Sequence, residues 1–127
     1  DWGKPGDYLL GTFVKATHGV ETVHGTNSIY EFYAEKGSFN RLVKKVLTGE
    51  VVTIKKGESW SVWGRNDIFN GMLNSLCPGQ VVKLTFTEES ETKMGQEKII
   101  KVAAPKDNEG KPVMNQEYLD SLGIAGF

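Results

Sequence analysis

One short helical segment interrupts a chain whose other ordered stretches all have strand character. Within residues 66–77 the apolar side chains recur at the spacing of one helix face: Ile68, Phe69, Met72, Leu73 and Leu76. Asn66 or Asp67 can cap the start of this helix, and Pro78-Gly79 can end it. Because segments rich in strand formers precede and follow it, the sequence predicts a strand, one short helix and a second strand in that order.

Alternation of apolar and polar residues predicts five strands, at residues 7–16, 28–35, 59–64, 80–87 and 97–103. In the second strand the two faces are Tyr30, Phe32 and Ala34 against Ile29, Glu31 and Tyr33. In the third strand Trp60 and Trp63 point to opposite faces, so only one of them can face the core. The polar stretches 17–27 and 88–96 are expected to be loops.

Residues 37–57 allow two interpretations. They form either two short strands, 41–47 and 50–55, joined at Thr48-Gly49, or an extended excursion, and we favour the hairpin. One helix between the third and fourth of five strands is the order of the OB-fold. This five-stranded Greek-key barrel typically binds oligonucleotides or oligosaccharides.

After residue 104 the composition shifts to Pro, Lys, Asp, Asn and Gly, which marks the end of the core. We therefore expect residues 1–104 to form the OB-fold domain and residues 105–127 to form a tail. Asn115 can cap a short helix over residues 116–122, and Gly123 can end it. The apolar side chains of this helix are expected to dock on the barrel or on a partner: Tyr118, Leu119 and Leu122.

The bulk properties fit one soluble domain. A length of 127 residues is enough for one hydrophobic core. No apolar run approaches the roughly 18 residues of a membrane span, and the start of the chain lacks signal-peptide character, so no membrane association is expected. The single cysteine, Cys77, cannot form an internal disulfide, so we expect a buried small hydrophobe in a reducing, cytoplasmic compartment.

Basic residues gather in the middle of the chain, although the overall net charge is only −1. Residues 36–65 carry a net charge of +5, whereas residues 1–35 and residues 88–127 each carry −3. Such a distribution can present one positive face, suited to a polyanion, on a nearly neutral protein. The alternative is an ordinary solvated surface of lysines.

Trp63 lies on the polar face of its predicted strand, at the edge of the basic segment. An exposed indole is a stacking platform for an unpaired base, worth about 1–3 kcal/mol per base whatever the base is. The following Gly64 would allow close backbone approach, and Arg65 can bind phosphate. In the alternative interpretation Trp63 covers one end of the barrel. Trp60 has more of the character of a core residue.

Further binding candidates flank this position. Tyr33 and Phe39 are either secondary stacking platforms or structural residues, because the second strand and the loop after it border the third strand in an OB barrel. The candidate phosphate contacts are cationic side chains that would make binding salt-dependent: Lys15, Lys44, Lys45, Lys55, Lys56 and Arg65.

The sequence contains no strong catalytic or metal-binding motif. His18 and His24 have no cysteine nearby, so we expect loop histidines and no metal site. The chain lacks the His-Glu-x-x-His, phosphate-loop and Gly-x-Ser-x-Gly patterns. These observations predict a protein that is not an enzyme and needs no cofactor.

With these residues assembled, the chain resembles the compact OB-fold single-stranded DNA-binding proteins of tailed bacteriophages. The similar segments are Gly6-Asp-Tyr-Leu-Leu-Gly-Thr-Phe13, Ile29-Tyr-Glu-Phe-Tyr33, Trp60-Ser-Val-Trp-Gly64, Pro78-Gly-Gln-Val-Val-Lys-Leu-Thr-Phe86 and Lys98-Ile-Ile-Lys-Val102. The resemblance covers about residues 6–103. It implies sequence-nonspecific coating of single-stranded DNA through aromatic and basic residues, in phage replication or recombination within the bacterial host cytoplasm.

The C-terminal Phe127 is similar to the tail tip through which bacterial members of that family recruit replication or recombination proteins, but Gly123-Ile-Ala-Gly before it lacks their acidic cluster. Two other classes stay open. One is a phage structural or assembly module, in which the barrel binds protein and the aromatic residues and tail helix form a homo-oligomer interface. The other is an OB carbohydrate- or protein-recognition domain of a larger enzyme.

Overall fold

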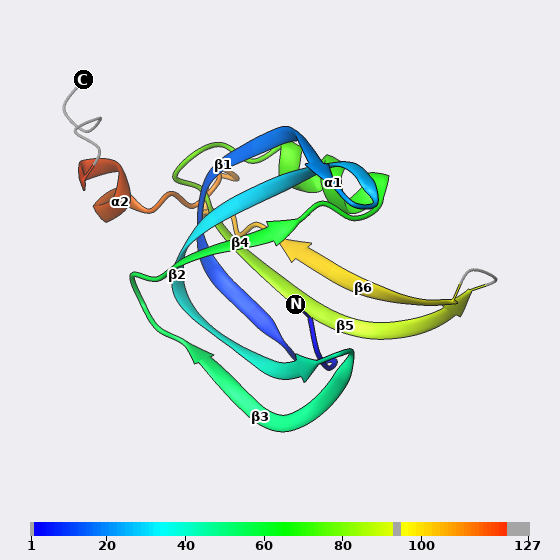
Figure 1. Cartoon of the computed structure of the whole chain (residues 1–127). Coiled ribbons are helices and arrows are strands. Elements are labelled where there is room, and N and C mark those ends of the chain that lie inside the picture. Colours follow the sequence, from blue (N-terminus) through cyan, green and yellow to red (C-terminus); the bar gives the residue numbers. More distant parts are fainter. Residues whose placement is uncertain (1, 93–94, 122–127) are drawn as a thin grey trace.

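One antiparallel sheet of six strands forms the body of the described chain, with two helices beside it (Figure 1). The computed structural model describes residues 2–92 and 95–121. In chain order the elements are β1 (Tyr8–Thr22), β2 (Gly25–Val43), β3 (Val46–Ile54), β4 (Ser59–Trp63), α1 (Asp67–Asn74), β5 (Val81–Thr92), β6 (Gly95–Ala103) and α2 (Gln116–Ser121). The predicted mainly β class is confirmed. The expected count of five strands is wrong, because residues 46–54 form a further strand in the sheet.

The 19-residue strand β2 organises the sheet. β1 pairs along one edge of β2, while β4 pairs with Ile29–Tyr33 and β3 with Gly37–Val43 along the other. β1 also pairs with β5, and β5 with β6, which gives the order β3-β2-β1-β5-β6 with β4 attached to β2. Figure 1 shows β2 curving past both β4 and β3. Within the described residues no ladder joins β4 to β6, and the sheet is open between them.

Two predicted loops are mostly strand. β1 continues to Thr22 and turns at Val23-His24, and β5 continues to Thr92 before β6 begins at Gly95. In residues 17–27, most of which are exposed, polar composition was a sign of exposure to solvent and not of irregular backbone. A two-stranded ribbon tolerates exposure on both faces because each strand satisfies the backbone hydrogen bonds of the other.

The predicted hairpin after residue 37 exists, but its turn lies at Lys44-Lys45 and not at Thr48-Gly49. Both lysines have positive φ angles, 50° and 66°, as the central residues of a type I′ turn do. Residues 48–50 instead form an irregularity opposite Arg41 in the ladder between β2 and β3. The buried side chains of Phe39 and Ile54 set the register of this ladder, so burial outweighs the local preference for glycine in the turn.

The hydrophobic core includes one face of β2. Tyr30, Phe32 and Ala34 of β2 are buried on one face, as the alternation predicts. Helix α1 adds Phe69 and Leu73 to the same core. Its predicted cap is confirmed, because the backbone N–H of Phe69 donates to the side-chain oxygen of Asn66 at 2.9 Å.

Both ends of the described chain pack on the sheet. At the N-terminal end Trp2 is buried. At the other end, the Val81 N–H donates to the Val113 carbonyl and the Asn115 N–H to the Gly79 carbonyl, each at 2.8 Å. Asn115 caps α2 as predicted, accepting from the Tyr118 N–H at 3.0 Å. The proposed roles of Leu122 and Gly123 lie outside the described residues.

Cys77 is exposed, so its predicted burial is wrong. It lies in the turn after α1, where its backbone N–H donates to the side-chain oxygen of Gln80 at 3.0 Å. The apolar face of α1 ends before this position, and no core contact draws the thiol inward.

Candidate functional site

A pocket of about 440 Å³ follows β4, the strand that pairs only with β2 in the described chain. Four aromatic side chains line it: Trp2, Phe39, Trp60 and Trp63. The remaining lining comes from Leu9, Ser61, Val62 and Arg65. The pocket therefore joins the N-terminal segment, β1, β2 and β4, which are separated by up to tens of residues along the chain.

Phe39 forms the centre of the aromatic wall. Its ring lies 5.0 Å from that of Trp2 and 5.5 Å from that of Trp60, with which it is stacked at 18°. Phe39 is only 8% exposed, which fits the structural one of its two predicted roles. The residue faces inward because it continues the buried face of β2, and it supports Trp60 from behind.

Trp60 packs against the core and is only partly exposed, as its sequence position suggested. Its indole Nε1–H is buried and has no hydrogen-bond partner among the described residues. A buried donor without an acceptor destabilises the folded state by about 1–3 kcal/mol. Among the described residues, the Trp60 indole N–H in the pocket wall therefore has no hydrogen-bond acceptor.

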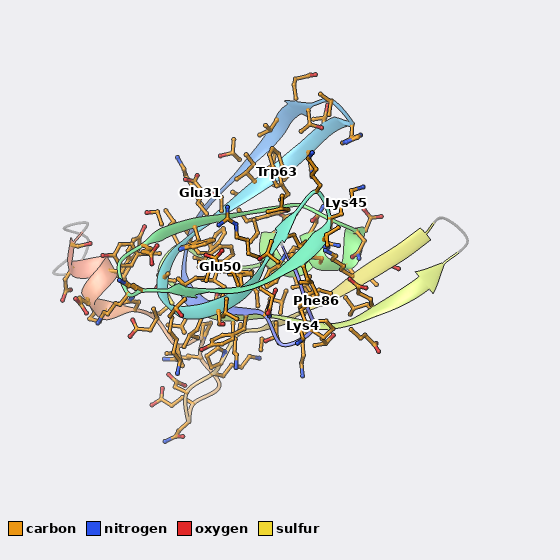
Figure 2. The ribbon with its side chains drawn as sticks, turned by 60° about the horizontal axis from the view of Figure 1, so that its bottom comes forward. Lys4, Glu31, Lys45, Glu50, Trp63 and Phe86 are labelled. Atoms are coloured by element: carbon orange, nitrogen blue, oxygen red, sulfur yellow. The ribbon has the colours of Figure 1, made fainter. Side chains whose placement is uncertain are left out.

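Trp63 lies on the opposite face of β4 from Trp60 and is 50% exposed. Trp63 is labelled in Figure 2, and so is Lys45, which lies in the turn between β2 and β3. The next residue, Gly64, is hydrogen-bonded to β2. Its N–H donates to the Ser28 carbonyl at 2.8 Å, and its carbonyl accepts from Asn27 Nδ2 at 3.2 Å. A Cβ at Gly64 would lie 2.7 Å from Asn27 Oδ1, so the Asn27 side chain would have to shift for any larger residue here. These contacts hold the backbone on the C-terminal side of Trp63 against β2.

Arg65 lies where the pocket meets two adjacent hollows of about 240 and 380 Å³. Its backbone N–H donates to Asn70 Oδ1 at 2.8 Å, and its guanidinium donates to the Lys98 carbonyl at 3.5 Å. Partial burial lowers the pKa of Arg65, while the Glu97 carboxylate raises it. The group stays a cation at neutral pH, but it is a partly desolvated one.

Lys98 is a basic residue of this region that the sequence analysis did not select. Its ammonium donates to the Trp2 carbonyl and lies 5.7 Å from the centre of the Phe86 ring. Burial lowers the pKa of Lys98, Glu89 raises it, and Arg65 lowers it further. Lys98 lies far from the basic segment in sequence, and the fold of β6 beside the segment after β4 brings it to Arg65.

The structure does not bring the two lysine pairs together. Lys44 and Lys45 form the turn before β3, and Lys55 and Lys56 follow its other end. A strand of nine residues separates them, which is roughly 30 Å at the usual rise per residue. The +5 segment is therefore divided between two ends of the sheet.

Two of the predicted phosphate contacts already have acidic partners. Lys56 pairs with Glu35 at 3.9 Å and with Glu117 of α2 at 3.5 Å. Lys15 pairs with Glu31 at 3.5 Å. Such exposed pairs are weak, so a polyanion can compete for these lysines. They are nevertheless less available than Arg65.

Tyr33 is 39% exposed on the outer face of β2, as predicted. Its ring centre lies 6.1 Å from that of Tyr118, so α2 contacts this platform. Tyr33 does not line the pocket beside β4. It belongs to a separate hollow of about 140 Å³ together with Lys56 and Tyr118.

Within residues 2–92 and 95–121, no group of three or more His, Cys, Asp or Glu side chains is placed to hold a metal ion. His18 lies on β1, not in the expected loop, and its Nδ1 is 2.8 Å from the hydroxyl of Ser28. None of the helices in this part of the chain is long and apolar enough to cross a membrane.

Comparison of the chain with protein-family models, curated proteins and solved structures yields no match. The chemistry of the site is therefore the basis for assigning a function.

Proposed function

We propose that this protein binds single-stranded DNA without sequence preference, through base stacking beside β4 and phosphate contacts at Arg65. The observation that carries the proposal is the half-exposed indole of Trp63, at an aromatic pocket that Arg65 also lines. Flat rings beside a cation suit an unpaired nucleotide, because every base has a face that stacks and every nucleotide a phosphate.

The arrangement of strands supports an OB-type barrel. β1 pairs with both β2 and β5, and α1 stands between β4 and β5, as the helix of an OB-fold stands between the third and fourth strands of its barrel. In this proposal β2 and β4 form the binding face, and the gap between β4 and β6 is the open side of the barrel.

The distribution of charge refines the set of contacts. Arg65 and Lys98 lie nearest to the aromatic pocket. Lys44 and Lys45 would contact phosphates further along the strand, whereas Lys15, Lys55, Lys56 and Tyr33 would contribute less. Coating of single strands in phage replication or recombination is the biological role that the sequence resemblance adds to this proposal.

A second candidate is a protein-interaction module for phage structure or assembly. It is favoured by the hairpin of β2 and β3, where four apolar side chains are exposed: Val43, Val46, Leu47 and Val51. β3 pairs only with β2 in the described part of the chain, and an exposed apolar edge strand can pair with another chain.

Fluorescence anisotropy with labelled oligo-dT tests the main proposal. Trp63→Ala is expected to weaken binding by about 1–3 kcal/mol, or about 5- to 150-fold. Ile68→Ala is the matched control, because Ile68 is 78% exposed on α1 and does not line the pocket beside β4. Affinity should also be higher for single strands than for duplexes and should fall with added salt.

Unchanged affinity in Trp63→Ala would remove the stacking role. Absence of binding to any oligonucleotide, together with a solution mass several times 14.0 kDa, would favour the interaction module instead.

A further inference from the structure

The pocket beside β4 has the shape of a small-molecule site as well as that of an exposed stacking surface. Its volume of about 440 Å³ lies in the range of about 300–1,000 Å³ that small-ligand pockets occupy. The stacked contact with Phe39 holds Trp60 as a fixed wall. A surface that only stacks bases needs one exposed ring, whereas this pocket is lined by aromatic side chains from the N-terminal segment, β2 and β4.

Arg65 supplies an anion site at the same pocket. Within the described residues its guanidinium makes one hydrogen bond, a long one of 3.5 Å to the Lys98 carbonyl. Glu97 acts on it electrostatically, but no ion pair within 4.0 Å joins the two in this part of the chain. A partly desolvated guanidinium without a paired carboxylate is suited to bind phosphate through two parallel hydrogen bonds.

We propose that the pocket is a nucleotide subsite, which takes one unstacked base against its aromatic lining and the phosphate of that nucleotide on Arg65. This inference rests on the proposed function and narrows it. Much of the affinity for a single strand would come from one nucleotide, and a free nucleoside monophosphate would be a ligand by itself. The nearby ammonium of Lys98 adds positive potential at the phosphate position.

Titration with dTMP, thymidine and inorganic phosphate tests the subsite, with tryptophan fluorescence and the indole N–H signals in NMR spectra as readouts. The wild-type protein should bind dTMP about tenfold more tightly than thymidine, since a hydrogen-bonded charge pair is worth about that factor. Inorganic phosphate alone should bind more weakly than dTMP, because it lacks the stacked ring.

Arg65→Gln should bring the affinity for dTMP down to that for thymidine and leave thymidine binding unchanged. Arg41→Gln is the matched control, because Arg41 is the other arginine of the chain and pairs with Glu50 at 3.2 Å, on β3. The urea midpoint of each variant shows whether it folds, and the comparison of dTMP with thymidine on the wild-type protein needs no variant.

Equal affinities of the wild-type protein for dTMP and thymidine would overturn the subsite, as would full retention of dTMP binding in Arg65→Gln. If oligo-dT binds but dTMP does not, the subsite is wrong and the proposed function stands. If neither ligand binds, both proposals fail.

Discussion

Removing the Asp7 carboxylate, as in Asp7→Asn, is expected to have the largest effect on both the fold and the pocket. Asp7 is 1% exposed, and its two oxygens accept four hydrogen bonds. Oδ2 accepts from the backbone N–H groups of Gly3 and Lys4 at 2.8 and 3.1 Å. Oδ1 accepts from the backbone N–H and the side-chain amide of Asn40 at 3.0 and 2.7 Å. Asp7 thus ties the segment that carries Trp2 to β2.

Asp7→Asn keeps the shape of this side chain but turns one acceptor oxygen into a donor. The new amide then faces either two backbone N–H groups or the pair from Asn40, so two hydrogen bonds to a charged group are lost. Each is worth about 1.5–3 kcal/mol net. A flip of the Asn40 amide recovers one of them, so we expect a loss of about 2–4 kcal/mol of unfolding free energy. That is a large share of the roughly 6–19 kcal/mol typical of a domain of this length.

Urea unfolding followed by tryptophan fluorescence measures the effect, as a shift of the midpoint at unchanged slope. Glu109→Gln is the control, since it removes only an exposed pair with Lys111 and should leave the midpoint where it is. A loss below about 1 kcal/mol in Asp7→Asn would refute the view that the buried carboxylate holds the N-terminal segment. Trp2 should also become more accessible to fluorescence quenchers in this variant.

Three further variants test the backbone. A Cβ on Gly3 would overlap the Asn40 carbonyl oxygen, so Gly3→Ala should destabilise the protein by about 1–3 kcal/mol. Gly71→Ala, at a position in α1 with open space around it, should stabilise the protein by about 0.5–1 kcal/mol. A urea midpoint of Gly3→Ala above that of Gly71→Ala would contradict the close contact of the N-terminal segment with Asn40. Replacing Lys44-Lys45 by Asn-Gly should stabilise the hairpin by about 1–2 kcal/mol, because Asn and Gly suit positive φ better than lysine does. If both lysines contact phosphate, the same double variant should reduce the slope of log affinity against log salt for oligo-dT by about 1.4. A lower urea midpoint in this variant would contradict a type I′ turn at these positions.

Local pattern predicted much of the secondary structure correctly. Alternation along residues 28–35 identified the buried face of β2, and it separated the inner Trp60 from the outer Trp63. Asn66 and Asn115 cap α1 and α2 as expected, because a cap depends only on a side chain and the first turn of its own helix. These features depend on residues within one turn or one strand, so no distant contact is needed to infer them.

The failures share one cause. Most of the polar stretch 17–27, and residues 88–92 and 95–96 of the other, are strand because a neighbouring strand completes their hydrogen bonds. The hairpin turns at Lys44-Lys45 because Phe39 and Ile54 set its register. Phe39, for which a platform role and a structural role were both open, lies inside for the same reason. Each outcome depends on pairing between segments far apart in the chain, and residue preferences within a short window do not report it.

The positions of both helices, the caps, and the outward position of Trp63 all follow from the amino-acid sequence alone. The assembly of the pocket is different. Trp2, Phe39 and Trp60 meet because a buried carboxylate and a curved strand bring them together, and Arg65 contacts the Lys98 carbonyl because the fold places β6 beside the segment after β4. Such convergence is a property of long-range packing, in which the burial of many side chains at once selects one register and one set of neighbours. Only the tertiary structure decides which rings and charges share a site.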